Sequence, residues 1–202
     1  MTIHEPATLV TDLLLAVLGG WLAWRLHHRM PATNLAAHWW IRTLALTAVS
    51  AFVGGTYHGF APNFPDALRA TWWVVTLFII SLLAAAMALS LLHELVPPAG
   101  QRRWLVVIGF KLAAFGGAVL SHPRFVVAII DYGLVLVLWT VAALGSRRPW
   151  RGWMLAGVGL SVAAAVVQQM RWGFSPQFNH NDVYHVIQAG ALIAFYRAGR
   201  KL

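Results

Sequence analysis

Apolar stretches alternate with short polar connections along the whole chain. Seven of these stretches approach the roughly 20 apolar residues that an α-helix needs to cross the hydrocarbon core of a bilayer. They cover residues 9–26, 38–60, 71–92, 104–120, 125–144, 152–170 and about 181–197. Pro, Gly and Asn gather in the connections, as expected for turns. The pattern therefore predicts an all-α, polytopic membrane protein, with seven transmembrane helices in a single domain over residues 1–202.

The seventh segment is the least apolar of the series. Its uninterrupted apolar core runs only from Ala189 to Phe195. Six spans with one additional helix at the membrane surface is therefore the alternative count.

Composition points to lipid rather than water as the solvent. Hydrophobic residues make up 59% of the chain and charged residues only 10%, whereas soluble domains are typically about 25% charged. This balance argues against a soluble enzyme and also against disorder, which requires low hydrophobicity. Cysteine is absent, which excludes a disulfide framework, a thiolate metal site and a cysteine nucleophile.

The net charge of +9 is explained by where the basic residues fall. Eleven flank one set of helix ends: Arg25, Arg29, Arg42, Arg102, Arg103, Arg147, Arg148, Arg151, Arg197, Arg200 and Lys201. Only Arg69, Arg124 and Arg171 flank the other set. The positive-inside rule then predicts an outer amino terminus and a cytoplasmic carboxyl terminus in a cell membrane of the bacterial inner-membrane type. Seven spans satisfy this pattern, and no nucleic-acid partner is needed to explain the charge.

Tryptophan follows the same division, and the pattern predicts aromatic belts at both membrane interfaces. Near the inner helix ends are Trp21, Trp24, Trp39, Trp40, Trp104, Trp150 and Trp153. Near the outer ends are Trp72, Trp73 and Trp172.

Polar side chains inside membranes are costly and are candidates for function. His58 comes sixteen residues after Arg42, a rise of about 24 Å, and so lies near the outer end of the second helix. Other regions bring ligand-type side chains to the same level: Asp12, Asp66, Gln168, Gln169, His180, Asp182 and His185. Structural alternatives are caps at Asp12 and Asp66, the latter with Arg69, and hydrogen bonds of the glutamines between helices. Gly54, Gly55 and Gly59 indicate close helix packing around His58.

Histidine and carboxylate side chains together suit zinc, which in catalytic sites keeps three protein ligands and one open position. His58 and His185 are the expected pair of ligands. The third ligand is either His180, if it precedes the regular helix and turns inward, or Asp182, which shares a helix face with His185. The cap of this helix is expected at Asn179 or Asn181.

Two further charges lie within the predicted spans. Lys111 is in the fourth segment and Asp131 in the fifth, and both reach the middle of the membrane. Either charge alone would be expensive there, so we expect them to form an internal ion pair.

The sequence resembles the superfamily of alkaline ceramidases and adiponectin receptors. The resemblance rests on seven spans with an outer amino terminus and on residues 54–60 (GGTYHGF) and 179–185 (NHNDVYH). It implies a seven-helix fold and a zinc-dependent hydrolase of lipid amides, and Asp66 loosely matches the family's aspartate after the second helix. The sequence departs where Gly54 replaces a serine and where the helix-seven histidines are five residues apart instead of four.

These observations together predict a zinc-dependent membrane hydrolase that acts on a lipid amide or ester. His58, His185 and His180 (or Asp182) would hold the metal, and Asp66 or Asp182 would carry the proton. Helices two, three, five, six and seven would enclose the acyl chain, and the expected partners are membrane lipids. The alternatives are a b-type haem protein with histidine ligands from two helices, and a non-enzymatic receptor or transporter.

Overall fold

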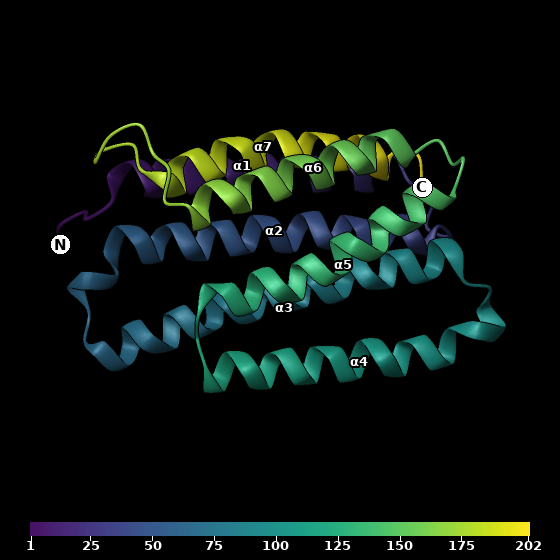
Figure 1. Ribbon diagram of the computed structural model, residues 1–202, viewed down its shortest axis with the longest axis horizontal. Helices are drawn as coiled ribbons and strands as arrows, with labels where there is room; N and C mark the ends of the chain where they lie inside the picture. Colours follow the sequence, from purple (N-terminus) through teal and green to yellow (C-terminus); the bar gives the residue numbers. More distant parts are fainter.

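The computed structural model describes residues 1–202 and is entirely helical, with no strand (Figure 1). Its helices are α1 (Pro6–His27), α2 (Leu35–Phe60), α3 (Asp66–Leu95), α4 (Pro98–Ser121), α5 (Phe125–Gly145), α6 (Arg151–Gln169) and α7 (His180–Gly199). A short 3-10 helix, η1 (Ala61–Asn63), follows α2. Each predicted apolar segment falls on one helix, so the all-α class and the helix count are confirmed.

Local chemistry sets several helix boundaries. The Asn34 side chain accepts a hydrogen bond from the Ala37 amide, 2.9 Å away, and caps the start of α2. Pro6 and Pro98 occupy the first positions of α1 and α4, where the missing amide hydrogen costs nothing. α7 begins with a capping box in which Asn179 and Asp182 bond each other's backbone amides. Asn179, one of the two predicted caps, is therefore the residue that caps α7.

Six of the seven helices form a closed ring, and the remaining one, α4, lies outside it. α1 packs on α2, α2 on α3, α3 on α5, α5 on α6, α6 on α7, and α7 returns to α1. α4 packs only on α3 and α5 and forms the margin of the molecule (Figure 1). The ring therefore encloses an interior to which α4 does not contribute.

The outward surfaces of the helices are largely apolar. On α4, Val106 and Phe110 are 69% and 76% exposed, and on α5 Val137 is 60% exposed. Five helices, α1, α3, α4, α5 and α6, are long and apolar enough to cross a membrane. α2 and α7 fall below that criterion because they carry most of the polar residues that face the interior.

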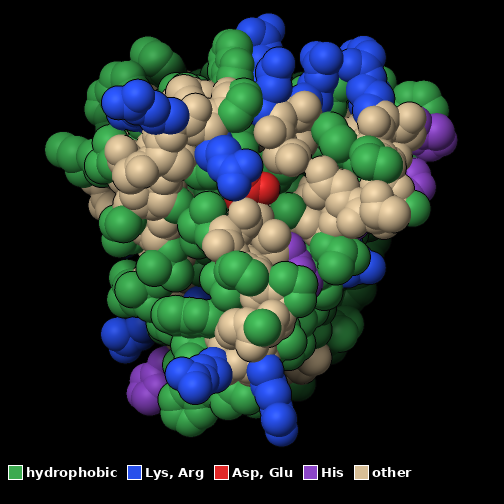
Figure 2. All heavy atoms as spheres, turned by 90° about the vertical axis from the view of Figure 1, so that its right-hand side faces the viewer, with side chains coloured by type: hydrophobic (Ala, Val, Ile, Leu, Met, Phe, Trp, Pro, Cys, Tyr) green, Lys and Arg blue, Asp and Glu red, His purple; other side chains and the backbone are tan.

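The two ends of the bundle differ in charge. We call the end that holds the carboxyl terminus the basic end, because the eleven clustered Arg and Lys residues flank its helix termini. Figure 2 looks onto this end and shows Lys and Arg side chains spread across it. Several of them lie over tryptophan rings, as Arg25 does over Trp21 and Arg197 over Trp153, at 4.7 and 4.4 Å from the ring centroids.

The predicted ion pair within the bundle is confirmed. The ammonium group of Lys111 on α4 contacts the carboxylate of Asp131 on α5. Asp131 is fully buried and the Lys111 side chain is only 16% exposed. Because α4 makes few other contacts with α5, this pair is the main polar attachment of the peripheral helix.

Removal of Lys111 alone should destabilise the protein more than removal of both partners. Lys111→Met leaves a buried, unpaired carboxylate, which typically costs about 3–5 kcal/mol, whereas Lys111→Met with Asp131→Leu restores an apolar contact. Thermal unfolding midpoints of the wild type, both single variants and the double variant in one detergent measure the coupling. Losses that simply add would show that the two residues do not interact.

Close packing of α1 on α2 depends on one glycine beside Asp12. A Cβ atom at Gly55 would lie 2.5 Å from the Asp12 Cβ, which is closer than real contacts allow, whereas one at Gly54 would meet nothing nearer than Thr76 Cγ2 at 3.6 Å. We therefore expect Gly55→Ala to lower the unfolding midpoint by pushing α1 away from α2, and Gly54→Ala to leave it nearly unchanged. Equal effects of the two neighbouring substitutions would contradict this account of the helix contact.

Candidate functional site

The ring of helices encloses a cavity of about 330 Å³. It extends along α2 from His58 to Trp40, a span of eighteen residues or about 27 Å of helix. Its walls come from α2, α3, α5, α6 and α7, the helices expected from the sequence, and also from α1 through Asp12 and Leu15. The cavity thus connects the end of the bundle opposite the basic end with the interior.

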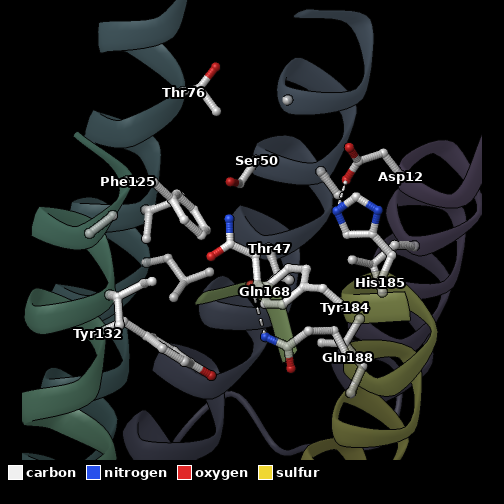
Figure 3. Close-up of a pocket in the computed structure, with 18 of the residues that line it drawn as sticks. Asp12, Thr47, Ser50, Thr76, Phe125, Tyr132, Gln168, Tyr184, His185 and Gln188 are labelled. Carbon is white, nitrogen blue, oxygen red and sulfur yellow. Dashed lines mark hydrogen bonds and ion pairs between the residues drawn. The ribbon is translucent and has the colours of Figure 1, made fainter. Parts of the chain in front are cut away.

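Asp12 and His185 meet at the end of the cavity opposite the basic end. Asp12 Oδ1 lies 3.1 Å from His185 Nε2, and both residues are buried (Figure 3). The other ring nitrogen of His185, Nδ1, lies 3.0 Å from the hydroxyl of Thr11. Asp12 is in the second turn of α1 and does not cap the helix. Its position therefore favours the interpretation of Asp12 as a ligand-type side chain over its interpretation as a helix cap.

Asp182 continues this chain of contacts. Its Oδ1 accepts a hydrogen bond from the Thr11 hydroxyl at 3.3 Å, and its Oδ2 accepts one from the Asn179 amide at 2.6 Å. Asp182 is fully buried. Both of its oxygens are therefore engaged in the helix cap and in the contact with α1.

His58 is held by a different carboxylate. Its Nδ1 lies 3.3 Å from Glu5 Oε2, and the hydrogen bond from His58 lowers the pKa of Glu5. Glu5 is brought there by the first residues of the chain, which fold back onto the end of α2. The His4 amide donates to Gly59 O at 3.1 Å, and Thr2 and Asn63 exchange hydrogen bonds.

The two histidines are oriented in the same way. Each has its Nδ1 held by a carboxylate, directly by Glu5 for His58 and through Thr11 for His185. Nε2 is therefore the ring nitrogen left for the cavity on both, and at His185 it faces Asp12. Both line the same cavity near its mouth.

Zinc fits the chemistry of this donor set, which offers two imidazoles and one carboxylate from three different helices. The side chains are paired with one another in this structure, and no three His, Asp or Glu residues converge on one point at metal–ligand spacing. Asp12 and His185 would have to exchange their mutual contact for contacts with a metal. The Nδ1 contacts are of the kind that orient metal-binding histidines in proteins.

The remaining predicted residues have other surroundings. His180 is the first residue of α7, so it does not precede the helix as expected, although it does line the mouth of the cavity. Asp66 begins α3, is 91% exposed at its side chain and pairs with Arg69. It is not among the residues that line the cavity.

The middle of the cavity carries a second polar group that sequence reasoning missed. Gln188 Oε1 accepts a hydrogen bond from Ser161 at 3.1 Å, and Gln188 Nε2 donates to the Tyr184 hydroxyl at 3.2 Å. Tyr132 of α5 lines the same region. The signal was present in the spacing, because Asn181, Tyr184, His185 and Gln188 fall on one face of a helix.

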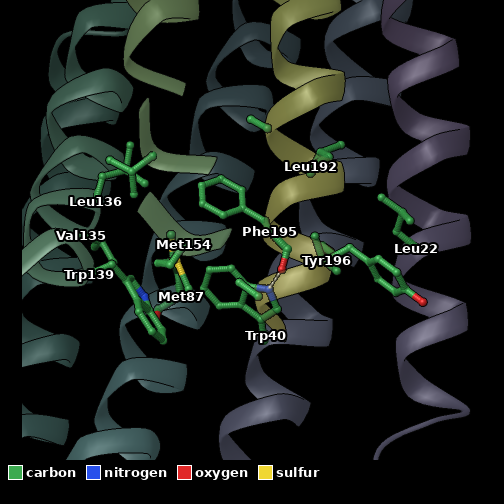
Figure 4. Packing of buried hydrophobic residues seen from close by; sticks show 14 of the residues in the cluster. Leu22, Trp40, Met87, Val135, Leu136, Trp139, Met154, Leu192, Phe195 and Tyr196 are labelled. Atoms are coloured by element: carbon green, nitrogen blue, oxygen red, sulfur yellow. Dashed lines mark hydrogen bonds between the residues drawn. The ribbon is translucent and has the colours of Figure 1, made fainter. Parts of the chain in front are cut away.

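Tryptophan and other apolar side chains close the deep end of the cavity (Figure 4). The Trp40 and Trp139 rings meet edge to face at 5.1 Å, and Trp40 meets Phe195 in the same way at 5.6 Å. The indole N–H of Trp40 donates to Phe195 O at 2.9 Å. The sequence assignment of Trp40 and Trp150 to an interfacial belt is therefore wrong, because both are completely buried in the core.

Comparison with known proteins adds a family but no activity. No curated protein and no solved structure matches the chain. Residues 7–202 match the model of a family described as "Family of unknown function (DUF6962)". Because the match covers nearly the whole helical bundle and its cavity, the chain belongs to the DUF6962 family.

Proposed function

We propose that this protein spans a cell membrane seven times, binds zinc at the mouth of its cavity, and hydrolyses an amide or ester bond of a lipid. The apolar outward faces of α1, α4 and α5 support insertion in lipid, because an exposed apolar surface of this extent is unfavourable in water. The basic end is then cytoplasmic by the positive-inside rule, and the cavity opens toward the outer side.

Orientation can be tested without reference to activity. A reporter that is active only in the cytoplasm should be active when it is fused after Leu202, because eleven of fifteen basic residues lie at that end of the helices. A matched reporter inserted in the loop between α6 and α7 should report the outer side. Reversal of both signals would contradict the orientation and would move the mouth of the cavity to the cytoplasmic face.

The proposal depends above all on the orientation of His58 and His185. Each presents Nε2 at the mouth of the same cavity while a carboxylate holds its Nδ1. Asp12, on the Nε2 of His185, would be the third ligand. We thus favour Asp12 over His180 and Asp182 as the third ligand, because Asp182 has both oxygens engaged elsewhere.

Zinc bound there would lower the pKa of a coordinated water to about 7 and polarise the substrate carbonyl. The chain's own residues would do the rest. Glu5 and the Thr11–Asp182 pair keep the two imidazoles in fixed orientations. His180, half-buried at the mouth, would pass a proton to the leaving group. Tyr184 and the deeper walls would position the chain of the lipid.

Metal analysis tests the site directly. Wild-type protein purified in mild detergent should contain about one zinc per chain, and added zinc should raise the unfolding midpoint because it binds the folded state. His58→Ala, His185→Ala and Asp12→Ala should abolish both effects. His180→Ala and Asp66→Ala should retain the metal, while Asp182→Asn should weaken its binding by about 10–100-fold through the loss of orientation of His185.

Two outcomes would overturn the proposal. One is wild-type protein that neither contains zinc nor gains stability from it. The other is a visible absorption band of a histidine-ligated haem that disappears in His58→Ala, which would make the protein a b-type haem protein.

A further inference from the structure

We propose that the middle of the cavity binds a hydroxyl group carried on the hydrocarbon chain of the ligand, close to its polar head. The hydroxyl-binding site consists of Tyr184 and Gln188 of α7, Tyr132 of α5 and Thr47 of α2. This inference deepens the proposed function, since it assumes that a lipid chain enters the cavity. It names the chemical class of that lipid, a chain with a hydroxyl near the carbonyl.

Gln188 lies just below His185 on α7, and Tyr184 lies beside His185. Gln188 follows His185 by three residues and Tyr184 by four, so all three share one face of α7. One helical turn, about 5 Å, therefore separates the polar middle from the mouth. Figure 3 shows the Tyr132, Tyr184 and Gln188 side chains directed toward one another below the Asp12–His185 contact.

These side chains have hydrogen-bonding capacity that the protein does not use. The Gln188 amide donates one hydrogen to the Tyr184 hydroxyl oxygen and accepts one hydrogen bond from Ser161. Its second amide hydrogen and the hydroxyl hydrogen of Tyr184 have no protein acceptor. Enclosed hydrogen-bond donors are costly unless they find an acceptor. The cavity is therefore suited to a ligand that offers an acceptor at this depth.

The opposite wall supplies the complementary acceptor. The Thr47 hydroxyl donates its hydrogen to Thr43 O at 2.9 Å, so it can only accept a hydrogen bond from a ligand. A hydroxyl on the ligand can accept from Tyr184 and donate to Thr47 at the same time. A carbonyl could only accept, and a methylene could do neither, so the hydroxyl is the group that satisfies both walls.

The deep part of the cavity shows why the polar group must lie near the head of the ligand. Beyond Gln188 the α7 face continues with Leu192 and Phe195, and Leu44 and Met87 line the opposite side. This region ends at the buried Trp40. The rest of the chain therefore meets mostly apolar walls, with the Thr43 hydroxyl already donating to Trp39 O at 3.1 Å. A hydroxyl on the ligand would lose most of its hydrogen bonds with water there without replacement.

Binding of three fatty acids of equal length tests the inference. Palmitic acid, β-hydroxypalmitic acid and a palmitic acid hydroxylated near its methyl end are titrated into the full-length protein in one detergent, and Kd is measured calorimetrically. Wild-type protein should bind the β-hydroxy acid roughly tenfold more tightly than palmitic acid, the effect of about one hydrogen bond in an enclosed site. The acid hydroxylated near its methyl end should show no gain over palmitic acid.

Isosteric variants assign the preference to the named residues. Tyr184→Phe and Thr47→Val each remove a single hydroxyl from the wall and should bring the ratio of the two Kd values close to one. Tyr196→Phe is the matched control, because its buried hydroxyl is on the same helix but outside the cavity, and it should retain the tenfold ratio. His58→Ala should retain the ratio as well, because the hydroxyl-binding site does not involve the proposed metal.

The outcomes separate this inference from the proposed function. Equal affinity of the wild type for all three acids would overturn the hydroxyl-binding site and leave lipid binding intact. A tenfold ratio that persists in both Tyr184→Phe and Thr47→Val would also overturn it. Failure of the wild type to bind any of the acids would overturn both the inference and the lipid-binding part of the proposed function.

Discussion

Buried polar groups in an apolar helix bundle must find partners, and this constraint closes the ring. Asp12, Asp182 and His185 are all buried, and each would be strongly destabilising alone. Asp12 contacts His185 directly, and the Thr11 hydroxyl of α1 contacts both His185 and Asp182 of α7. Because the first and last helices are bonded in this way, six helices enclose a cavity instead of forming an open layer. α4, which contributes no side chain to the cavity, is the helix that remains outside the ring.

The same constraint operates at other depths with different chemistry. Between α4 and α5 it is met by a single ion pair, Lys111 with Asp131. At the deep end of the cavity it is met by indole N–H groups that donate to backbone carbonyls, as Trp139 does to Met87 O at 3.1 Å. These carbonyls have a second lone pair available beyond their helical hydrogen bond. The Trp40 and Trp139 side chains therefore seal the interior with their own indole N–H groups hydrogen-bonded.

Sequence reasoning predicted depth well and neighbours poorly. Helix rise alone put His58, Asp12 and His185 at one level, because distance along a helix is fixed at 1.5 Å per residue. It could not decide which side chains meet, since the rotation of each helix about its axis is set by tertiary packing. Trp40 was placed correctly near a helix end yet faces the core. Asp182 was a candidate ligand because it shares a face with His185, but the capping box uses one of its oxygens.

α2 and α7, the least apolar helices, carry most of the polar residues of the site. The closed ring explains how such helices fit in an apolar bundle. α2 and α7 fail the test for membrane-crossing apolarity, and they supply the polar residues on opposite walls of the cavity. α2 is packed between α1 and α3, and α7 between α1 and α6. Their polar faces are thus turned to the interior and shielded from the surroundings by more apolar neighbours. A helix on the margin, such as α4, has no such shield, and Lys111, the one charge within its apolar stretch, is held against Asp131 on the side that faces the bundle.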